Sequence, residues 1–398
     1  MQMSKPKIRF NGYTEDWEQR KVSDLLQERN EQAPMSDEYP LMAFIANQGV
    51  APKGDRYDRS ALVNDEAGKK YKKTEYGDFI YSSNNLETGS IGLNKYGNAC
   101  ISPVYSIFKP TGKADLNFLG RRFLRKDFIN EMVKWRQGVV YGQWKIHESD
   151  FMKIEIAVPS IDEQKAIGQY LDNLDSLITL HQRKCEQTKK LKKYMLQKMF
   201  PQNGSTVPEI RFAGFTEAWE QRKFGDLGSV SMCKRIFKEQ TTPEGDIPFY
   251  KIGTFGGEPD AYISRELFEE YKEKFQYPKV GDMLISASGT IGRTVEYTGE
   301  DAYFQDSNIV WFRHDDRVDN SFLKCIYSSV KWAGIEGSTI KRLYNDNFLK
   351  TEFSLPGVEE QQRIGAYFNS LDTLITLHQR KCDELQSIKK YMLQNMFT

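Results

Sequence analysis

Apolar residues recur at close to a seven-residue period between residues 161 and 200, which predicts one long helix. The seam of this helix contains Leu174, Ile178, His181 and Cys185. Ser160 and Glu163 form a capping box where the pattern begins, and Gly168 is the only glycine or proline before Phe200. We therefore expect a helix of about 40 residues, or roughly 60 Å in length.

The same pattern returns 197 residues later. Residues 359–397 are identical to residues 162–200 at 24 of 39 positions, with no gap. The second seam contains Leu371, Ile375, His378 and Cys382. A long amphipathic helix exposes its seam unless a partner covers it, and the obvious partner of each helix is its own copy. We expect an antiparallel coiled coil about a pseudo-twofold axis, with His181 and His378 at the same height.

A second repeat precedes each helix. Residues 6–24 return as residues 208–226 with 13 of 19 positions identical, whereas the blocks that follow resemble each other far less. The chain therefore contains an opening motif, a variable block and a long helix, each twice. We divide it into a first domain, its helix, a linker with the second domain, and the second helix, at residues 1–159, 160–200, 201–356 and 357–398. Divergent blocks on a shared frame favour two versions of one binding task, and a duplicated domain with a drifted surface is the simpler alternative.

Both variable blocks mix strands with helices. Gly77-Asp78 and Gly281-Asp282 each place a tight turn before a short apolar run, which is typical of a strand. Residues 116–135 and 321–335 have helical character. We expect two similar domains of mixed α/β (α+β) structure, separated by the two long helices.

Each of these strands is followed by a polar loop that ends in Ile-Gly, at Ser82–Gly92 and Ser286–Gly292. Small polar residues beside glycine can contact phosphates or base edges, although an ordinary hairpin connection has the same composition. A second polar segment recurs within Gly138–Pro159 and Gly337–Pro356. The candidate nucleic-acid contacts of the first block are Ser83, Asn84, Asn85, Thr88, Ser90, Lys95, Tyr141, Gln143 and Lys145. Those of the second block are Ser286, Ser288, Thr290, Arg293, Ser338, Thr339, Lys341 and Arg342.

Charge is balanced over the whole chain but not locally. There are 56 basic and 55 acidic residues, for a formal net charge of +1. Residues 109–145, in contrast, carry nine basic and three acidic residues, which suits a surface that follows phosphates. Basic helices are also common on solvated faces. The run adds Arg121 and Arg122 to the candidates, and a smaller cluster in the second block adds Lys234 and Arg235.

The sequence disfavours several classes of protein. Five cysteines without a CxxC spacing make neither a disulfide framework nor a zinc ribbon. The common phosphate-loop, dinucleotide, metalloprotease and amino-methyltransferase motifs are missing, which argues against catalysis or a cofactor of this chain's own. No apolar run reaches the roughly 20 residues of a membrane span, and no secretory apolar region follows Met1, so we expect a cytoplasmic protein.

The four His and Cys residues of the two seams raise one metal hypothesis. Two His and two Cys at one level of a helix pair are a possible zinc ligand set. The alternative is that these semi-polar side chains only fix the register of the coiled coil.

In this order the motifs resemble the DNA specificity subunits of type I restriction-modification systems. The resemblance covers essentially the whole chain and is carried by the opening motifs Pro6–Glu18 and Pro208–Glu220, the Gly281–Gly292 segment and the repeated helix. The first block departs from the pattern through its longer Ser82–Gly92 loop. The resemblance implies two target-recognition domains, each reading one half of a split sequence in double-stranded DNA, with the helices setting the gap.

The resemblance also implies a non-catalytic chain that recruits partners. These are two methyltransferase subunits, which use S-adenosylmethionine to methylate adenine N6, and two restriction or translocase subunits, which use ATP and Mg²⁺. Because both copies of the frame must serve identical partners, we expect the ends near Trp17 and Trp219 to dock the methyltransferases. The alternative function is a coiled-coil adaptor with two protein-binding domains and no role on DNA.

Overall fold

The structure is a computed structural model that describes residues 5–52, 69–139, 143–202, 204–335 and 341–397. The chain forms two compact units. Unit 1 contains Met1–Leu180 and Lys381–Thr398, and unit 2 contains His181–Arg380. Within the described ranges, no helix is long and apolar enough to cross a membrane.

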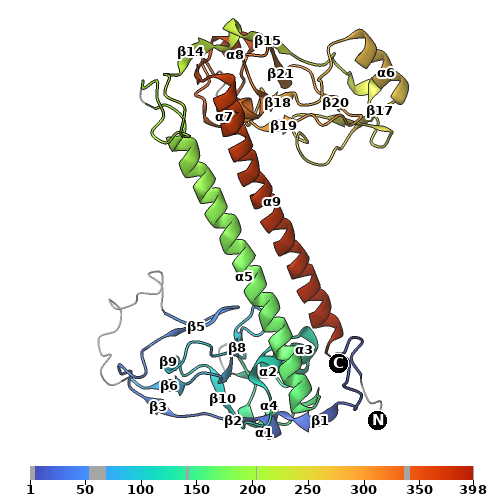
Figure 1. The fold of residues 1–398 in the computed structure, drawn as a ribbon. Helices are drawn as coiled ribbons and strands as arrows, with labels where there is room; N and C mark the ends of the chain where they lie inside the picture. Colours follow the sequence, from blue (N-terminus) through green and yellow to red (C-terminus); the bar gives the residue numbers. More distant parts are fainter. Residues whose placement is uncertain (1–4, 53–68, 140–142, 203, 336–340, 398) are drawn as a thin grey trace. The chain divides into compact units, whose positions relative to one another are not determined.

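Two helices of 38 residues each, α5 (Ile161–Lys198) and α9 (Val358–Asn395), run through both units (Figure 1). The first half of α5 and the last turns of α9 belong to unit 1, and the remaining halves belong to unit 2. The predicted helix over residues 161–200 is confirmed to within two residues. A sustained heptad pattern without internal proline is a strong local signal, which explains the agreement.

Unit 1 is built mainly from short antiparallel strands. Its largest sheet has the order β2 (Leu26–Glu28), β10 (Ser106–Pro110), β7 (Phe79–Tyr81), β8 (Ile91–Leu93). A second sheet has the order β3 (Gln32–Ala33), β6 (Tyr71–Thr74), β9 (Ala99–Ile101). Unit 1 also contains three separate strand pairs: β1 (Glu18–Lys21) with β13 (Glu155–Val158), β4 (Ala43–Ile45) with β5 (Gly49–Ala51), and β11 (Gln137–Val139) with β12 (Gln143–Lys145). Its shorter helices are α1 (Val22–Leu25), α2 (Leu116–Phe123), α3 (Lys126–Val133) and α4 (Glu148–Phe151).

Unit 2 repeats the main sheet in the order β15 (Gly228–Ser231), β21 (Ile309–His314), β18 (Met283–Ser286), β19 (Thr294–Glu296). The pair β14 (Glu220–Lys223) with β22 (Glu352–Leu355) repeats β1 with β13. A further sheet has the order β17 (Tyr262–Ile263), β16 (Ile247–Tyr250), β20 (Tyr303–Phe304), and β16 pairs with β20 in parallel. The shorter helices are α6 (Arg265–Lys274), α7 (Asn320–Ser329) and α8 (Asn345–Lys350). The mixed α/β fold class and the two Gly-Asp strand starts, at β7 and β18, are confirmed.

Two of the predicted helical stretches are shorter than the pattern indicates. Residues 116–135 form α2 and α3 with a break at Leu124 and Arg125, which lets the rings of Phe123 and Phe128 stack 4.5 Å apart. The stretch 321–335 ends as α7 at Ser329, and Trp332 beyond it packs on Phe224 with ring centroids 5.8 Å apart. Tertiary packing of aromatic residues overrides the local helical pattern in both places.

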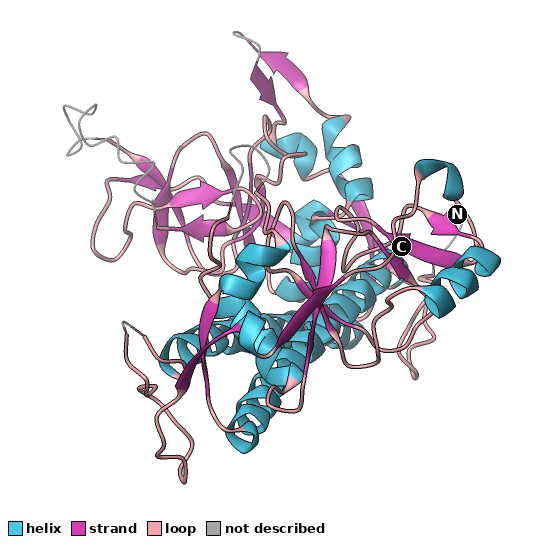
Figure 2. Cartoon of the chain, turned by 90° about the horizontal axis from the view of Figure 1, so that it is seen from above, coloured by secondary structure: helices cyan, strands magenta, loops and turns pink. Residues whose placement is uncertain are grey.

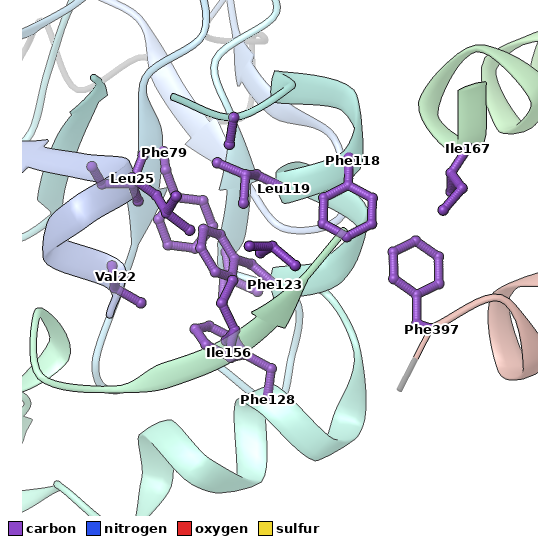
Figure 3. Packing of buried hydrophobic residues seen from close by; sticks show 14 of the residues in the cluster. Val22, Leu25, Phe79, Phe118, Leu119, Phe123, Phe128, Ile156, Ile167 and Phe397 are labelled. Atoms are coloured by element: carbon purple, nitrogen blue, oxygen red, sulfur yellow. The ribbon is translucent and has the colours of Figure 1, made fainter. Parts of the chain in front are cut away.

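Each unit has an aromatic core that is closed by the end of a long helix. In unit 1 the ring of Phe397, just beyond α9, stacks 5.3 Å from Phe118, and Ile167 of α5 lies beside these two rings (Figure 3). In unit 2 Phe200, just beyond α5, stacks 5.7 Å from Phe322. Residues 199–200 and 396–397 are therefore the same core-closing element in two copies.

The repeated Glu-Gln pair at the start of each long helix ties that helix to its own unit. In unit 1 the buried Glu163 carboxylate accepts two hydrogen bonds of 2.7 Å from Arg9 of the opening motif. Gln164 accepts a 3.0 Å bond from the backbone N–H of Asp115, the residue that caps α2. Bidentate pairs between Arg and a carboxylate fix geometry as well as supplying energy.

Unit 2 makes the same contacts with the second copy. Glu360 accepts bonds of 2.7 and 2.8 Å from Arg211, and Gln361 accepts a 2.9 Å bond from the N–H of Asp319, which caps α7. A Cβ added at Gly168 would fall 2.7 Å from the carboxylate of Asp115. These contacts explain why the start of the helix motif returns almost unchanged.

The seam of the helix pair has the symmetry that the repeat predicts. In unit 2 the Nδ1 atoms of His181 and His378 lie 3.0 Å apart, and Cys185 Sγ lies 3.9 Å from the carbonyl oxygen of Ile375. In unit 1 Cys382 Sγ lies 4.0 Å from the carbonyl oxygen of Ile178. The expected equal height of the two histidines is confirmed.

Each seam thiol lies close to a backbone carbonyl of the other long helix, Cys185 to that of Ile375 and Cys382 to that of Ile178. In the part of the chain that the structure describes, no three His, Cys, Asp or Glu side chains are grouped to hold a metal ion. The observed contacts of Cys185 and Cys382 are of the kind that semi-polar residues make when they fix the register of a helix pair.

Candidate nucleic-acid interface

In unit 1 the loop after β7 and the β11–β12 hairpin are joined by hydrogen bonds, although about 55 residues separate them in the sequence. Asn84 accepts a 2.6 Å hydrogen bond from the backbone N–H of Trp144. Ser83 Oγ accepts a 3.0 Å bond from the N–H of Ile146, and its carbonyl accepts a 3.0 Å bond from Arg136 Nε. These bonds hold the loop and the hairpin together, and we call their exposed residues the surface of unit 1.

The candidates of this surface divide into exposed residues and internal supports. Asn84, Asn85, Thr88 and Gln143 are exposed, and Lys145 is half-buried beside Glu148, 2.7 Å away. Lys95 is also exposed, but it follows β8 and belongs to neither the loop nor the hairpin. Tyr141 lies outside the described residues.

Ser83 and Ser90 are corrections to the sequence-based candidates. Both are buried and 7% exposed. Ser83 is bonded to Ile146, and the backbone of Ser90 is bonded to Asn85 and Ser82, so these residues shape the loop and do not offer side chains to a ligand. Small polar residues satisfy a tight loop internally as readily as they contact DNA.

In unit 2 the corresponding loop, Ser286–Gly292, meets the segment Lys341–Leu343. The backbone N–H of Gly289 donates to the carbonyl of Lys341 at 2.9 Å, and that of Leu343 donates to Ala287 at 2.8 Å. In both units, therefore, the polar loop is hydrogen-bonded to a segment near the end of the same variable block. The alignment of Gly138–Pro159 with Gly337–Pro356 in the sequence anticipates this relation.

A polar turn at residues 306–308 supports the basic side chains of this surface. Arg342 donates to Asn308 Oδ1 at 3.3 Å and lies 6.0 Å from the centre of the Tyr344 ring. Arg235 pairs with Asp306 at 2.8 Å. A surface hollow of about 510 Å³ lies between this turn and α8, with Arg342 and Lys350 on its wall.

Among the candidates of unit 2, Lys234, Arg235, Thr290, Arg293, Lys341 and Arg342 are exposed. Ser286 and Ser288 are buried, at 2% and 7% exposure. The Ser286 hydroxyl donates to the carbonyl of Thr290 at 2.5 Å and accepts from the N–H of Arg293 at 2.9 Å, so it closes the loop from inside. Ser338 and Thr339 lie outside the described residues.

Arg121 and Arg122 are mostly buried and are held in ion pairs with acidic residues of unit 1. Arg121 pairs with Asp172 at 2.5 Å and Asp175 at 2.9 Å, which attaches α2 to α5. Arg122 is 8% exposed and pairs with Asp127 at 2.9 Å, and burial lowers the pKa of its guanidinium. Part of the positive charge of residues 109–145 is therefore neutralised by ion pairs within unit 1.

Trp17 and Trp219 are core residues with exposures of 4% and 2%. Trp17 packs edge-on against Phe118 with centroids 5.7 Å apart, and Trp219 packs likewise on Phe200 at 5.8 Å. Their indole rings therefore have no surface with which to dock a partner. The strands that follow them, Glu18–Lys21 and Glu220–Lys223, are exposed along their whole length.

Sequence patterns miss several residues that build the two surfaces. Asn308 and Asp306 position Arg342 and Arg235, but no repeated motif marks them. Arg136 and Trp144 belong to the basic run at residues 109–145, and that run is the signal that could have found them.

A family model described as the type I restriction modification DNA specificity domain matches residues 14–190 and again residues 216–387. A putative type I restriction enzyme specificity subunit of Haemophilus influenzae, S.HindORF215P, is 46% identical over 231 residues, which cover 58% of this chain. The match spans 59% of the length of that relative. The MjaVIII specificity subunit of Methanocaldococcus jannaschii is 22% identical over 410 residues, with 96% of this chain and 92% of the relative covered.

Two solved structures have a similar fold. The type I restriction-modification S subunit from M. genitalium has a TM-score of 0.59 and 14% identity, with 99% of both chains covered. A chain from a study of complex assembly and conformational transition of the type I system has a TM-score of 0.50 and 17% identity, with 98% of this chain and 99% of that chain covered.

Proposed function

The chain belongs to the type I restriction modification DNA specificity family, and on that premise we propose that each unit reads one half of a bipartite DNA target. The observation that carries the proposal is the repeated relation of two polar segments on a duplicated frame. The frame contacts of Glu163 and Glu360 are the same, whereas the exposed residues of the two surfaces differ. Two different readers on one frame suit two different half-sites.

Base readout in this proposal comes from the exposed polar and basic side chains of the two surfaces. In unit 2 these include Arg342, which a bidentate contact to guanine would suit, and Lys341, which suits a phosphate. In unit 1 they include Asn84 and Gln143, whose amides suit adenine. The length of the two long helices would set the number of base pairs left unread between the half-sites.

Partner subunits are proposed to dock on the outward side of the long helices. Exposed apolar residues recur at equivalent positions of both: Leu177 with Leu374, Leu180 with Leu377, Leu191 with Ile388 and Tyr194 with Tyr391. We call these eight residues the outer stripe. On each helix they form two pairs that lie two seven-residue periods apart, with polar residues such as Lys184 and Gln187 at the positions between them, so each helix carries an interrupted second apolar line that suits a partner subunit.

Each unit holds one half of the outer stripe, with Leu177, Leu180, Ile388 and Tyr391 in unit 1. Two equivalent sets fit two copies of a methyltransferase subunit. In this proposal the chain itself does no chemistry. S-adenosylmethionine would be bound by the methyltransferase subunits, and ATP and Mg²⁺ by two restriction or translocase subunits.

Methylome sequencing of cells with and without this chain tests the proposal. We expect adenine methylation at one split sequence to disappear when the chain is deleted and to return when it is supplied. Retention of the matching duplex by the chain with its methyltransferase partner is the binding counterpart. Unchanged methylation together with no sequence-dependent retention would instead support the protein-binding adaptor.

A further inference from the structure

The short helices α2 and α7 lie against the long helix of their own unit, α2 on α5 and α7 on α9 (Figure 1). A Cβ added at Gly168 of α5 would fall 3.0 Å from Asn117 of α2, and one added at Gly365 of α9 would overlap the Ser321 hydroxyl of α7. Figure 2 shows the long helices foreshortened, because it looks down on the chain from above. The close approach fixes one end of each short helix, since Asn117 and Ser321 both belong to its first turn.

In unit 1 a single carboxylate joins the short helix to both long helices. One oxygen of Asp175 on α5 lies 2.9 Å from Arg121 Nη2 of α2, and the other lies 2.5 Å from Lys389 Nζ of α9. Arg121 Nη2 also lies 2.5 Å from Asp172, which is three residues earlier on α5. All of these residues belong to unit 1. The short helix is therefore held at a second point, six residues after its Asp115 cap.

Unit 2 repeats this arrangement atom for atom. One oxygen of Asp372 on α9 lies 3.1 Å from Lys324 Nζ of α7, and the other lies 2.5 Å from Lys192 Nζ of α5. Lys324 also donates to Asn369 Oδ1 at 3.2 Å. Each of the long-helix residues lies 197 positions from its counterpart in unit 1. We call the two sets the carboxylate triads: Arg121, Asp175 and Lys389 in unit 1, and Lys324, Asp372 and Lys192 in unit 2.

The variable blocks keep a positive charge at this point although they resemble each other little elsewhere. Arg121 and Lys324 are different residues, six and five positions after their caps, and both reach the same carboxylate. The simpler interpretation is that the triads only add stability. Their side chains are 12–39% exposed, however, and partly exposed ion pairs contribute little net stability. A carboxylate that is bonded through both oxygens instead defines a direction.

We propose that the carboxylate triads fix the orientation of each reading unit on its own long-helix segments, and that Asp175 and Asp372 thereby limit how many unread base pairs the protein accepts between the half-sites. This inference rests on the proposed DNA-reading function. Helix length sets the preferred number, whereas the triads set how strictly it is enforced. One extra base pair displaces a half-site by about 3.4 Å and rotates it by about 35°. A unit that turns on its helices would follow that change, and a fixed unit would not. Asp175 and Asp372 are therefore positioning residues.

The test uses the full chain bound to its methyltransferase partner and the duplex that methylome sequencing identifies, with one base pair added or removed between the half-sites. Asp175→Asn combined with Asp372→Asn keeps the shape of both side chains and removes their charge. The ratio of affinities for the native and altered spacers is expected to fall by a factor of about 2 to 30. Discrimination at single base pairs within the half-sites is expected to stay unchanged. A merely structural role would lower the melting temperature and leave the spacer ratio as it is.

Two further double variants complete the test. Glu186→Gln combined with Glu384→Gln is the matched control, because each carboxylate is exposed and pairs with a lysine of its own helix. It is expected to keep the wild-type spacer ratio. Lys192→Met combined with Lys389→Met removes the third member of each triad and keeps the apolar part of the side chain. This variant should also relax the spacer ratio, and it provides the measurement if the asparagine variant does not fold.

The inference is wrong if the asparagine and methionine variants both keep the wild-type spacer ratio. It is also wrong if discrimination within the half-sites falls by the same factor as the spacer ratio, since the variants would then have lost specific binding in general. In each case, sequence-specific binding by the wild type would still support the proposed function. Absence of specific binding by the wild type would contradict both.

Discussion

At the scale of single residues, the proposed function assigns a phosphate contact to one basic side chain of unit 2 and a base contact to another. Lys341→Ala is expected to weaken binding of all duplexes uniformly and to reduce the slope of log affinity against log salt by about 1. Arg342→Ala is expected to cost about 1–3 kcal/mol and to relax preference at one base pair. Titrations of cognate and singly changed duplexes at several salt concentrations measure both. Unchanged affinity and slope for both variants would place these residues outside the interface.

The buried Arg9–Glu163 pair gives a stability prediction. Glu163→Gln leaves an arginine beside a buried neutral partner and is expected to destabilise unit 1 by about 3 kcal/mol, or roughly 6–12 °C in melting temperature. Glu18→Gln is the matched control, because Glu18 pairs with Arg20 on the surface and both side chains are more than half exposed. Calorimetry of both variants measures the difference, and equal melting temperatures would contradict the structural role.

Asp78 gives a prediction about pH. Burial raises the pKa of this carboxyl to about 6, despite the neighbouring Arg29. Because folding favours the protonated form, its contribution to stability is complete below about pH 4 and is lost as the pH rises through about 6. The free energy of unfolding of the wild type is expected to fall over this range by on the order of 2–3 kcal/mol relative to Asp78→Asn. Urea titrations at pH 4, 5, 6 and 7 measure it, and parallel curves would contradict the shift.

The sequence identifies side-chain chemistry at this scale better than side-chain role. Arg121 and Arg122 carry the predicted charge, but Asp172 and Asp127 neutralise it through contacts that only the fold creates. Ser83, Ser286 and Ser288 have the predicted polarity, but their side chains are buried within their loops. No local pattern distinguishes a hydroxyl that faces solvent from one that closes a turn.

At the scale of elements, periodic segments are predicted well and irregular ones are not. The long helices follow from a pattern sustained over 38 residues, and the Gly-Asp turns locate β7 and β18. The contact between the loop after β7 and the β11–β12 hairpin joins segments about 55 residues apart, and nothing in either segment encodes the other. The repeat supplies the missing information, because a polar loop and a later polar segment recur together in both variable blocks, and such a recurring pair marks segments that meet in the fold.

The outer stripe gives a prediction at this scale. Leu180→Ser combined with Leu377→Ser is expected to reduce co-purified methyltransferase at least about tenfold, since each buried leucine contributes roughly 1.5–3 kcal/mol. The melting temperature should be almost unchanged, because both side chains are already exposed. Arg183→Ser combined with Arg380→Ser, also exposed on the same helices, is the matched control. Full retention of the methyltransferase by the leucine variant would exclude the stripe as its docking site.

At the scale of the whole molecule, each unit takes its core-closing phenylalanine from just beyond a long helix. Phe397→Ala is expected to destabilise unit 1 by about 3–5 kcal/mol, and Phe200→Ala to destabilise unit 2 by a similar amount. Hydrogen exchange resolved by peptide separates the two effects, with β7 reporting on unit 1 and β18 on unit 2. Faster exchange of both strands in either variant would show that the units do not open independently.

The place of Phe397 in the core of unit 1 has a consequence for how the protein is made. Residues 1–180 leave the ribosome long before residues 381–397, which complete their unit. At about 5–20 residues per second the delay is roughly 10–40 s, and during this time Phe397 does not yet cover the aromatic core around Phe118. Unit 2, which is continuous in sequence, has no such delay. The first domain to be synthesised is thus the last to be finished, and chaperones that cover exposed aromatic surface should act on it during translation.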